Sequence, residues 1–385
     1  MFIAAGNGIR RVERFYMKRN ETIQIFRGIL CLYIVFGHAL DGLRAFNPFG
    51  FLQVSVTPFF VMSGFLLALN SKPDNEPLNL KSCFASMKKR IARLYPLHVA
   101  TAVFIFLLWA VRYWHGGIFW EQISDLSINL FLNILLLQSW FPKNAISLNS
   151  PAWYLSTAAF LYFAFPLIKK INYKFDRGAL LFAIILLLRF FYVAAVLSVD
   201  FATNSELYSK WACYHFPLFR LTDFWIACLA GAFYMKNKDK LRLSNFASAL
   251  GQLVAAVFGV AFFSIKLDAF PFWIRVFFKS DIVRLLLSVL WVYFFFEGKG
   301  FLRFLNVVPL VALGNISGFC YLIHCPVMEF QNAITAFLNV DLTKFNSLQL
   351  YAVFFAEFYA TIALSLLWAF LGKRLASLSP RHAPA

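Results

Sequence analysis

Apolar runs alternate with short polar or basic stretches along nearly the whole chain. A helix needs about 20 predominantly apolar residues to cross a bilayer, and the sequence offers about ten runs of roughly that length. They lie near residues 22–41, 51–70, 94–113, 152–168, 178–198, 217–235, 245–265, 281–297, 307–330 and 348–371. This pattern predicts an all-α, polytopic integral membrane protein with about ten transmembrane helices.

One stretch, residues 115–151, is less regular than the rest of the chain. Its apolar part, residues 126–140, is short for a full crossing, so we expect a re-entrant or shallow helix on the side opposite the N-terminus. A full crossing would carry Lys169 and Lys170 to that opposite side, against the distribution of basic residues in the other loops.

The composition leaves little room for a separate soluble domain. The 385 residues are 61% hydrophobic and only 14% charged, and the mean hydropathy is +0.68. Soluble domains usually carry about 25% charged residues. We expect a basic tail over residues 1–21, one transmembrane domain over residues 22–375, and a disordered tail over residues 376–385.

The formal net charge of +18 raises the question of an anionic partner. Most of the 36 Lys and Arg residues lie in short segments on the side of the N-terminus, at 10–19, 72–93, 169–177, 236–242, 299–303 and 373–381. Short loops rich in basic residues remain in the cytoplasm, so this alternation predicts that both termini are cytoplasmic. Nucleic-acid binding would need basic and aromatic residues on one solvated surface, whereas these basic residues lie in short loops between apolar runs. We therefore expect the protein to lie in a lipid bilayer and not to bind nucleic acid.

The first apolar run and the cysteines carry no cleavage or metal signal. Residues 22–41 contain Arg27 and lack a small-residue cleavage site, which indicates a retained helix rather than a signal peptide. The six cysteines are scattered, mostly within apolar runs, without a C-x-x-C pair or a metal-ligand spacing. We expect them to serve in packing, and we predict no metal site.

Arg27 and His38 lie inside the first apolar run, where such residues are costly and tend to mark functional sites. Their spacing places them within about 20° on one helix face and roughly 16 Å apart along the axis. Arginine suits a phosphate, and a neutral histidine suits a hydroxyl from which it takes a proton. Alternatively, Arg27 reaches the lipid headgroups and His38 forms a structural hydrogen bond. Spacing alone allows both interpretations.

Five segments, in order along the chain, resemble motifs of the acyltransferase family 3 membrane proteins. Arg27 with His38 resembles an R-x10-H motif, and residues 57–66 are similar to FFVLSGFL. Residues 90–96 are similar to an R-x-x-R loop ahead of a helix. Residues 151–166 are similar to WSLSVEEQFYLLFP, and residues 316–326 to ISYSLYLIHWP. The chain departs from the family at Ala158 and Ala159, where glutamates are usual. Many relatives carry a C-terminal SGNH hydrolase-like domain, and we expect the transmembrane domain here to act without one.

The resemblance implies transfer of an acyl group, most often acetyl, from cytoplasmic acyl-CoA to a hydroxyl of a polysaccharide or lipid-linked oligosaccharide. It implies a bacterial inner-membrane enzyme with acyl-CoA as its donor substrate and no permanently bound cofactor. Arg27, Arg90 and Arg93 would hold the CoA phosphates. His38 would act as a general base, with an acyl-histidine intermediate as the alternative. For Arg90 and Arg93, the alternative is anchoring by positive charge on the cytoplasmic side.

Further polar and aromatic residues are candidates for an acceptor pocket on the opposite side, and they are Trp153, Ser156, His324 and Glu357. Each also has a structural interpretation, such as an interfacial anchor for Trp153 and a hydrogen bond within the bundle for His324. Arg220 and Asp223 can pair at a spacing of i, i+3, and we expect a structural ion pair.

A polytopic transporter or flippase for a lipid-linked glycan or acyl donor is the alternative function. Such a protein would share the polytopic fold but should show inverted repeats with Gly/Pro-interrupted helices in matching halves, which the sequence does not display. The sequence leaves open which sugar and hydroxyl are modified, which acyl group is moved, and the oligomeric state.

Overall fold

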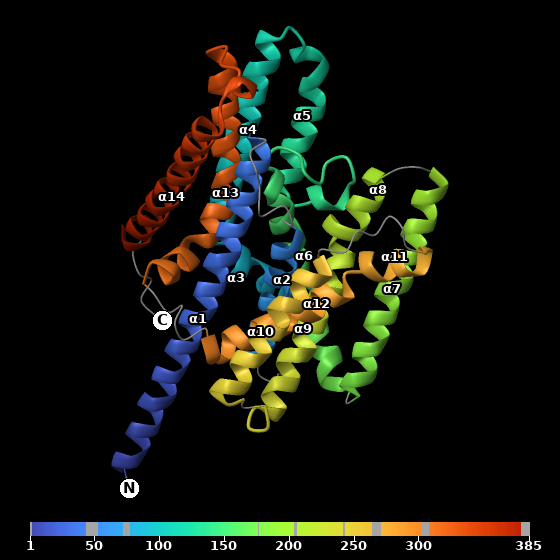
Figure 1. The fold of residues 1–385 in the computed structure, drawn as a ribbon, viewed down its shortest axis with the longest axis vertical. Coiled ribbons are helices and arrows are strands. Elements are labelled where there is room, and N and C mark those ends of the chain that lie inside the picture. The colour runs from blue at the N-terminus through green and yellow to red at the C-terminus, as the bar shows by residue number, and fades with distance from the viewer. Residues whose placement is uncertain are drawn as a thin grey trace.

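The computed structural model describes residues 2–43, 53–71, 78–175, 177–203, 206–241, 243–263, 271–301 and 308–378. The regular elements within these ranges are all helical (Figure 1). They are α1 (Phe2–Gly42), α2 (Gln53–Leu69), α3 (Leu80–Ile91), α4 (Tyr95–His115), α5 (Phe119–Ile134), η1 (Gln138–Trp140), η2 (Ser150–Ala152), α6 (Trp153–Lys174), α7 (Gly178–Thr203), α8 (Glu206–Lys210), η3 (Trp211–His215), α9 (Pro217–Asn237), α10 (Asn245–Phe263), α11 (Phe272–Lys279), α12 (Ile282–Glu297), α13 (Val308–Phe337), η5 (Leu342–Lys344) and α14 (Ser347–Leu378).

The predicted apolar runs all contain helix, which confirms an all-α polytopic membrane protein. Within the described residues, seven helices are long and apolar enough to cross a bilayer. They are Glu21–Gly42, Tyr95–His115, Ser150–Lys174, Gly178–Val199, Tyr208–Asn237, Val308–Phe337 and Ser347–Leu375. The remaining three runs correspond to shorter helices, namely Val56–Leu69, Asn245–Phe258 and Ile282–Glu297. Helices suit these runs because every backbone polar group must find a partner away from water.

The two predicted tails are helical where the structure describes them. The basic segment at residues 1–21 continues directly into the first span, because α1 is one helix from Phe2 to Gly42. At the other end, α14 extends to Leu378 and therefore includes the first residues of the segment expected to be disordered. Residues 379–385 lie outside the described part of the chain.

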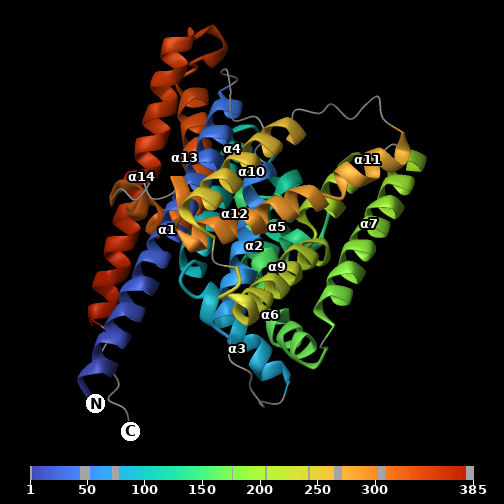
Figure 2. The same ribbon diagram turned by 60° about the horizontal axis from the view of Figure 1, so that its bottom comes forward.

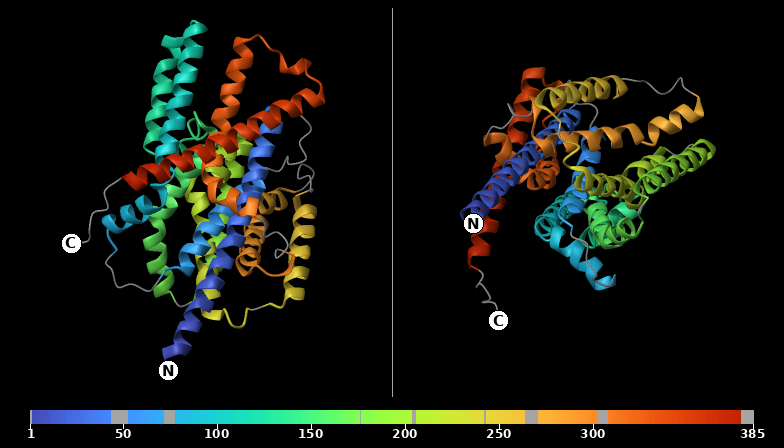
Figure 3. Two further views of the ribbon diagram at one scale, coloured as in Figure 1. Left: turned by 90° about the vertical axis from the view of Figure 1, so that its left-hand side faces the viewer. Right: turned by 90° about the horizontal axis from the view of Figure 1, so that it is seen from below.

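The helices surround a central group formed by α2, α6 and α9 (Figure 2). On one side lie α1, α13 and α14, and on the other lie α7 and α11. Helix α14 crosses the bundle obliquely over α13, as the left view of Figure 3 shows. Two helix pairs, α1 with α13 and α2 with α9, have the most extensive contacts.

Glycines allow these two pairs to approach closely. A Cβ on Gly314 of α13 would overlap the carbonyl oxygen of Gln24 on α1, and one on Gly28 would come within 2.9 Å of the Leu310 carbonyl oxygen. In the second pair, a Cβ on Gly64 of α2 would overlap the carbonyl oxygen of Phe224. Small residues at such positions let helix backbones pack closely within a membrane. The close approach of α1 and α13 therefore determines which residues of the two helices lie opposite each other.

The irregular stretch after α4 folds back into the bundle. Helix α5 returns alongside α4, and the chain that follows it buries Gln138, Ser139 and Asn149. The amide of Asn149 donates hydrogen bonds to the Thr101 hydroxyl and to the carbonyl oxygen of Leu322 on α13. Side-chain amides and hydroxyls thus pair the backbone and polar groups of this non-helical segment. Its depth in a bilayer stays a prediction.

Candidate functional site

A cavity of about 230 Å³ lies between α1, α2, α6, α13 and the turn that joins α3 to α4. Arg27 of α1, Arg90 at the end of α3 and Arg93 in the turn all line it. Much of the remaining wall is aromatic and includes Tyr154 of α6 and Tyr321 of α13. The three arginines that the sequence singled out therefore share one site, although they come from three separate segments.

Helix α3 places Arg90 at the cavity. The helix begins at the cap residue Asn79, whose side chain accepts a hydrogen bond from the backbone N–H of Ser82. Lys88, Lys89 and Arg90 occupy the last turn, where the helix dipole favours positive charge. The Arg90 guanidinium donates to the carbonyl oxygen of Ser86 at 2.7 Å. Partial burial lowers the pKa of Arg90, but a guanidinium remains charged at neutral pH.

Arg93 connects the turn after α3 to α13. Its Nη2 donates a hydrogen bond to the carbonyl oxygen of Asn315 at 3.0 Å, and its guanidinium lies 5.0 Å from the centre of the Phe319 ring. Helix α4 begins directly after this turn, and Pro96 lies in its first turn, where proline is well accommodated. The turn therefore presents Arg93 to the cavity and leaves part of its guanidinium fork for a ligand.

Three arginines give the cavity a positive charge. Among the residues that the structure describes, no ion pair joins Arg27, Arg90 or Arg93 to an aspartate or glutamate. The lining within that same part of the chain contains no acidic residue. Arginine forks of this kind bind phosphate oxygens in pairs. The site is therefore chemically suited to a phosphorylated anion.

His38 lies further along α1 and does not line this cavity. Its Nδ1 is 3.0 Å from Nε2 of His324 on α13. The His324 ring in turn lies 5.9 Å from the ring of Tyr321, which does line the cavity. Tyr321 therefore lies next to both the arginine cavity and the histidine pair.

The other residues predicted for an acceptor pocket lie elsewhere in the core. Ser156 is buried, donates to the carbonyl oxygen of Leu136 at 2.6 Å and shares a 2.6 Å hydrogen bond with the hydroxyl of Ser139. Trp153 is buried against His215, with ring centres 4.8 Å apart. These contacts favour structural roles for both residues, since they hold the irregular segment and η3 against α6.

Glu357 lies on a buried face of α14. It is 5% exposed, and its Oε2 has no hydrogen-bond partner among the residues that the structure describes. One turn away, Phe354 contacts the Phe36 ring of α1 with centres 5.2 Å apart. Glu357 is therefore a buried carboxyl outside the arginine cavity, one turn from a residue that contacts α1.

The sequence candidates did not include the three tyrosines of the cavity wall, which are Tyr154, Tyr162 and Tyr321. Tyr154 and Tyr162 both project from α6, and the Tyr162 hydroxyl donates to the Ser63 hydroxyl of α2 at 3.2 Å. Both tyrosines lie within segment 151–166, which had been compared with a family motif, and Ser63 lies within segment 57–66. The family resemblance therefore pointed to these segments. It did not indicate which face of α6 lines the cavity, because that depends on tertiary packing.

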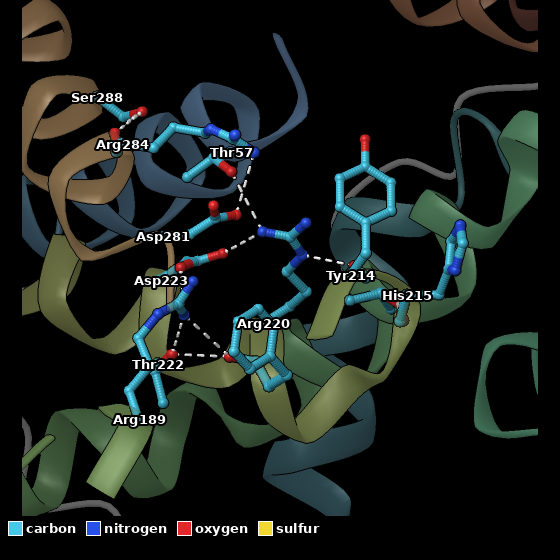
Figure 4. Close-up of polar contacts among 12 residues, drawn as sticks. Thr57, Arg189, Tyr214, His215, Arg220, Thr222, Asp223, Asp281, Arg284 and Ser288 are labelled. Carbon is cyan, nitrogen blue, oxygen red and sulfur yellow. Dashed lines mark hydrogen bonds and ion pairs between the residues drawn. The ribbon is translucent and has the colours of Figure 1, made fainter. Parts of the chain in front are cut away.

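A second buried charge cluster lies outside the cavity (Figure 4). Asp223 of α9 accepts from Arg189 at 2.7 Å and from Arg220 at 2.8 Å, with both arginines fully buried. The Arg220–Asp223 pair confirms the predicted ion pair, whereas Arg189 of α7 was not singled out from the sequence. Arg220 also donates to the Thr57 hydroxyl of α2 at 3.1 Å. The cluster ties α2, α7 and α9 together.

The fold and the cavity define a polytopic helical membrane protein with three arginines gathered at one site. The model of acyltransferase family 3, described as an acyltransferase domain, matches residues 20–374. The chain therefore belongs to this family and is a membrane acyltransferase. No curated protein and no solved structure gives a significant match to the chain.

Proposed function

We propose that this protein is a membrane O-acyltransferase that moves an acyl group, in the first instance acetyl, from acyl-CoA to a hydroxyl of an exported glycan. The observation that carries the proposal is the convergence of Arg27, Arg90 and Arg93 on one cavity without a carboxylate partner among the described residues. CoA carries phosphates on its nucleotide, and paired guanidinium forks suit phosphate oxygens.

The charge distribution supports a cytoplasmic donor site. Helix α3 and its turn belong to the basic segment at residues 72–93, which the positive-inside rule assigns to the cytoplasm together with both termini. In this orientation the arginines meet soluble acyl-CoA, in a bacterial inner membrane, and α1 carries His38 towards the other leaflet. The donor is a substrate, so the proposal includes no permanently bound cofactor.

His38 is the proposed general base. The acceptor hydroxyl oxygen attacks the thioester carbonyl carbon while Nε2 of His38 takes the hydroxyl proton. The carbon–sulfur bond then breaks, and the proton passes from His38 to the departing CoA thiolate. An ester of the glycan and free CoA are the products. An acyl-histidine intermediate is the alternative use of the same nitrogen.

The acceptor is proposed to be a polysaccharide or a lipid-linked oligosaccharide. The buried carboxyl of Glu357 and the ring of His324 lie on helices that pack against α1, and these helices border the region around His38. The structure gives no corresponding support for Ser156 and Trp153, whose contacts are within the core.

Transfer from labelled donor tests the function. Membrane vesicles from cells with and without the gene are supplied with 14C-acetyl-CoA, and radioactivity in the extracted glycan fraction is measured. We expect labelling with the wild-type protein, its loss in His38→Ala, and its retention in His115→Ala, an exposed histidine at the end of α4. Labelling that does not depend on the gene would exclude the proposed function, and full labelling in His38→Ala would exclude the base.

A further inference from the structure

The His38–His324 contact is a fixed feature of the α1–α13 interface. The nitrogen atoms are 3.0 Å apart, and the two rings lie nearly parallel at an angle of 28°. Gly28 and Gly314 bring the two helices together along the same interface. His324 is 1% exposed, so its ring has little freedom to rotate away from His38.

The second nitrogen of His324 determines where its hydrogen lies. Nδ1 of His324 is 3.2 Å from the carbonyl oxygen of Cys320, one turn earlier on α13. A carbonyl oxygen only accepts hydrogen bonds, so Nδ1 must be the donor. A neutral imidazole carries a single ring hydrogen, and burial in an apolar bundle favours the neutral form. Nε2 of His324 therefore holds a lone pair and faces His38 as an acceptor.

The tautomer of His38 follows from that of His324. Because Nε2 of His324 accepts, Nδ1 of His38 must carry the hydrogen of their 3.0 Å contact. The remaining nitrogen of His38, Nε2, is then unprotonated. This is the form in which an imidazole can remove a proton from a hydroxyl.

We infer that His324 is a positioning residue that holds His38 as the Nδ1–H tautomer, with the Nε2 lone pair directed at the acceptor hydroxyl. The inference rests on the proposed function and replaces the expectation that His324 binds the acceptor itself. When His38 takes up the hydroxyl proton, its Nδ1–H becomes a stronger donor to His324, which stabilises the cation formed during transfer. His324 remains neutral throughout, and Cys320 supplies only its carbonyl oxygen.

Two substitutions separate the acceptor role of His324 from its packing. In His324→Asn, the amide nitrogen can still donate to the Cys320 carbonyl, but no atom reaches the position of Nε2. In His324→Gln, the longer side chain can place its amide oxygen near that position and accept from His38. We expect kcat to fall about 100-fold or more in His324→Asn and to recover substantially in His324→Gln, with the KM for acetyl-CoA unchanged in both.

Equal activity of the two variants would overturn the inference, as would a loss expressed only in KM. If wild-type protein shows no transfer, the proposed function fails instead. If wild type transfers, His38→Ala does not, and His324→Asn matches wild type, the proposed function stands and the role of His324 falls.

A measurement on unmodified protein tests the tautomer without relying on activity. The 15N spectrum of protein labelled at histidine distinguishes protonated from unprotonated ring nitrogens, and comparison with His38→Gln and His324→Gln assigns the two rings among the six histidines. We expect both residues to be protonated at Nδ1 and unprotonated at Nε2. A proton on Nε2 of His38 in the neutral ring would overturn the inference.

Discussion

Arg93 reaches across from the α3–α4 turn to α13 and donates a hydrogen bond to the carbonyl oxygen of Asn315 at 3.0 Å. This contact closes one wall of the cavity, since Asn315 also lines it. The same guanidinium thus holds two segments together and contributes positive charge to the proposed donor site.

The double role of Arg93 predicts that charge alone is not sufficient there. A lysine keeps the positive charge but lacks the planar fork that can serve a carbonyl and a phosphate together. We expect Arg93→Lys to raise the KM for acetyl-CoA several-fold and Arg93→Ala to raise it about tenfold, with folded yield retained. Steady-state transfer kinetics provide the measurement. A KM in Arg93→Lys equal to that of wild type would show that the fork is not needed.

A side chain at position 314 is expected to disturb helix packing rather than acyl transfer chemistry. Its Cβ would overlap the carbonyl oxygen of Gln24, so Gly314→Ala must push α1 and α13 apart. We expect a loss of about 1–3 kcal/mol in stability, seen as a lower midpoint of thermal unfolding in detergent.

The matched control for Gly314 is Gly372, which lies in α14 with open space around the position of a Cβ. Gly372→Ala should leave the midpoint unchanged or raise it, because alanine is the better helix former. If both variants unfold at the wild-type temperature, the close approach of α1 and α13 is not a source of stability.

Among these variants, we expect substitution of Asp223 to cause the largest loss of stability. It is the carboxylate that pairs with both Arg189 and Arg220, and all three side chains are fully buried. Its removal leaves both buried guanidinium groups without the carboxylate that is hydrogen-bonded to them, and the loss of such a partner typically costs about 3–5 kcal/mol. We expect Asp223→Ala to lower the yield of folded protein sharply, as judged by size-exclusion chromatography. Asp125→Ala, at an exposed position of α5, should behave as wild type. A normal yield of Asp223→Ala would mean that the arginines are neutralised in another way.

The sequence predicted the helical architecture well because the length of each apolar run indicates by itself whether a helix can cross a bilayer. It also singled out Arg27, Arg90 and Arg93, since each lies in a segment with a recognisable pattern, and the structure places them in one cavity. It did not indicate the cluster around Arg189. That arginine has no carboxylate within a turn of α7, and its partner Asp223 is 34 positions away. Local spacing contains no information on such a pair.

The histidine pair shows the same limit. His38 and His324 were each identified as candidates, yet their separation of 286 positions gave no reason to join them. Their contact depends on the register of α1 against α13, which the two glycines and the surrounding side chains determine together. The sequence indicated that the chain after α5 is irregular but not its path through the bundle, because its hydrogen bonds to α4, α6 and α13 are all tertiary.

The most direct test of the donor site is the binding of CoA to purified protein in detergent, measured by calorimetry alongside pantetheine, which lacks the nucleotide and its phosphates. We expect CoA to bind at least tenfold more tightly than pantetheine, and we expect Arg27→Ala to remove most of that difference, because the arginines bind phosphates. Arg112→Ala, an exposed arginine at the far end of α4, serves as the control and should bind like wild type. Equal affinity for CoA and pantetheine, or unchanged CoA affinity in Arg27→Ala, would contradict the assignment of this cavity to acyl-CoA.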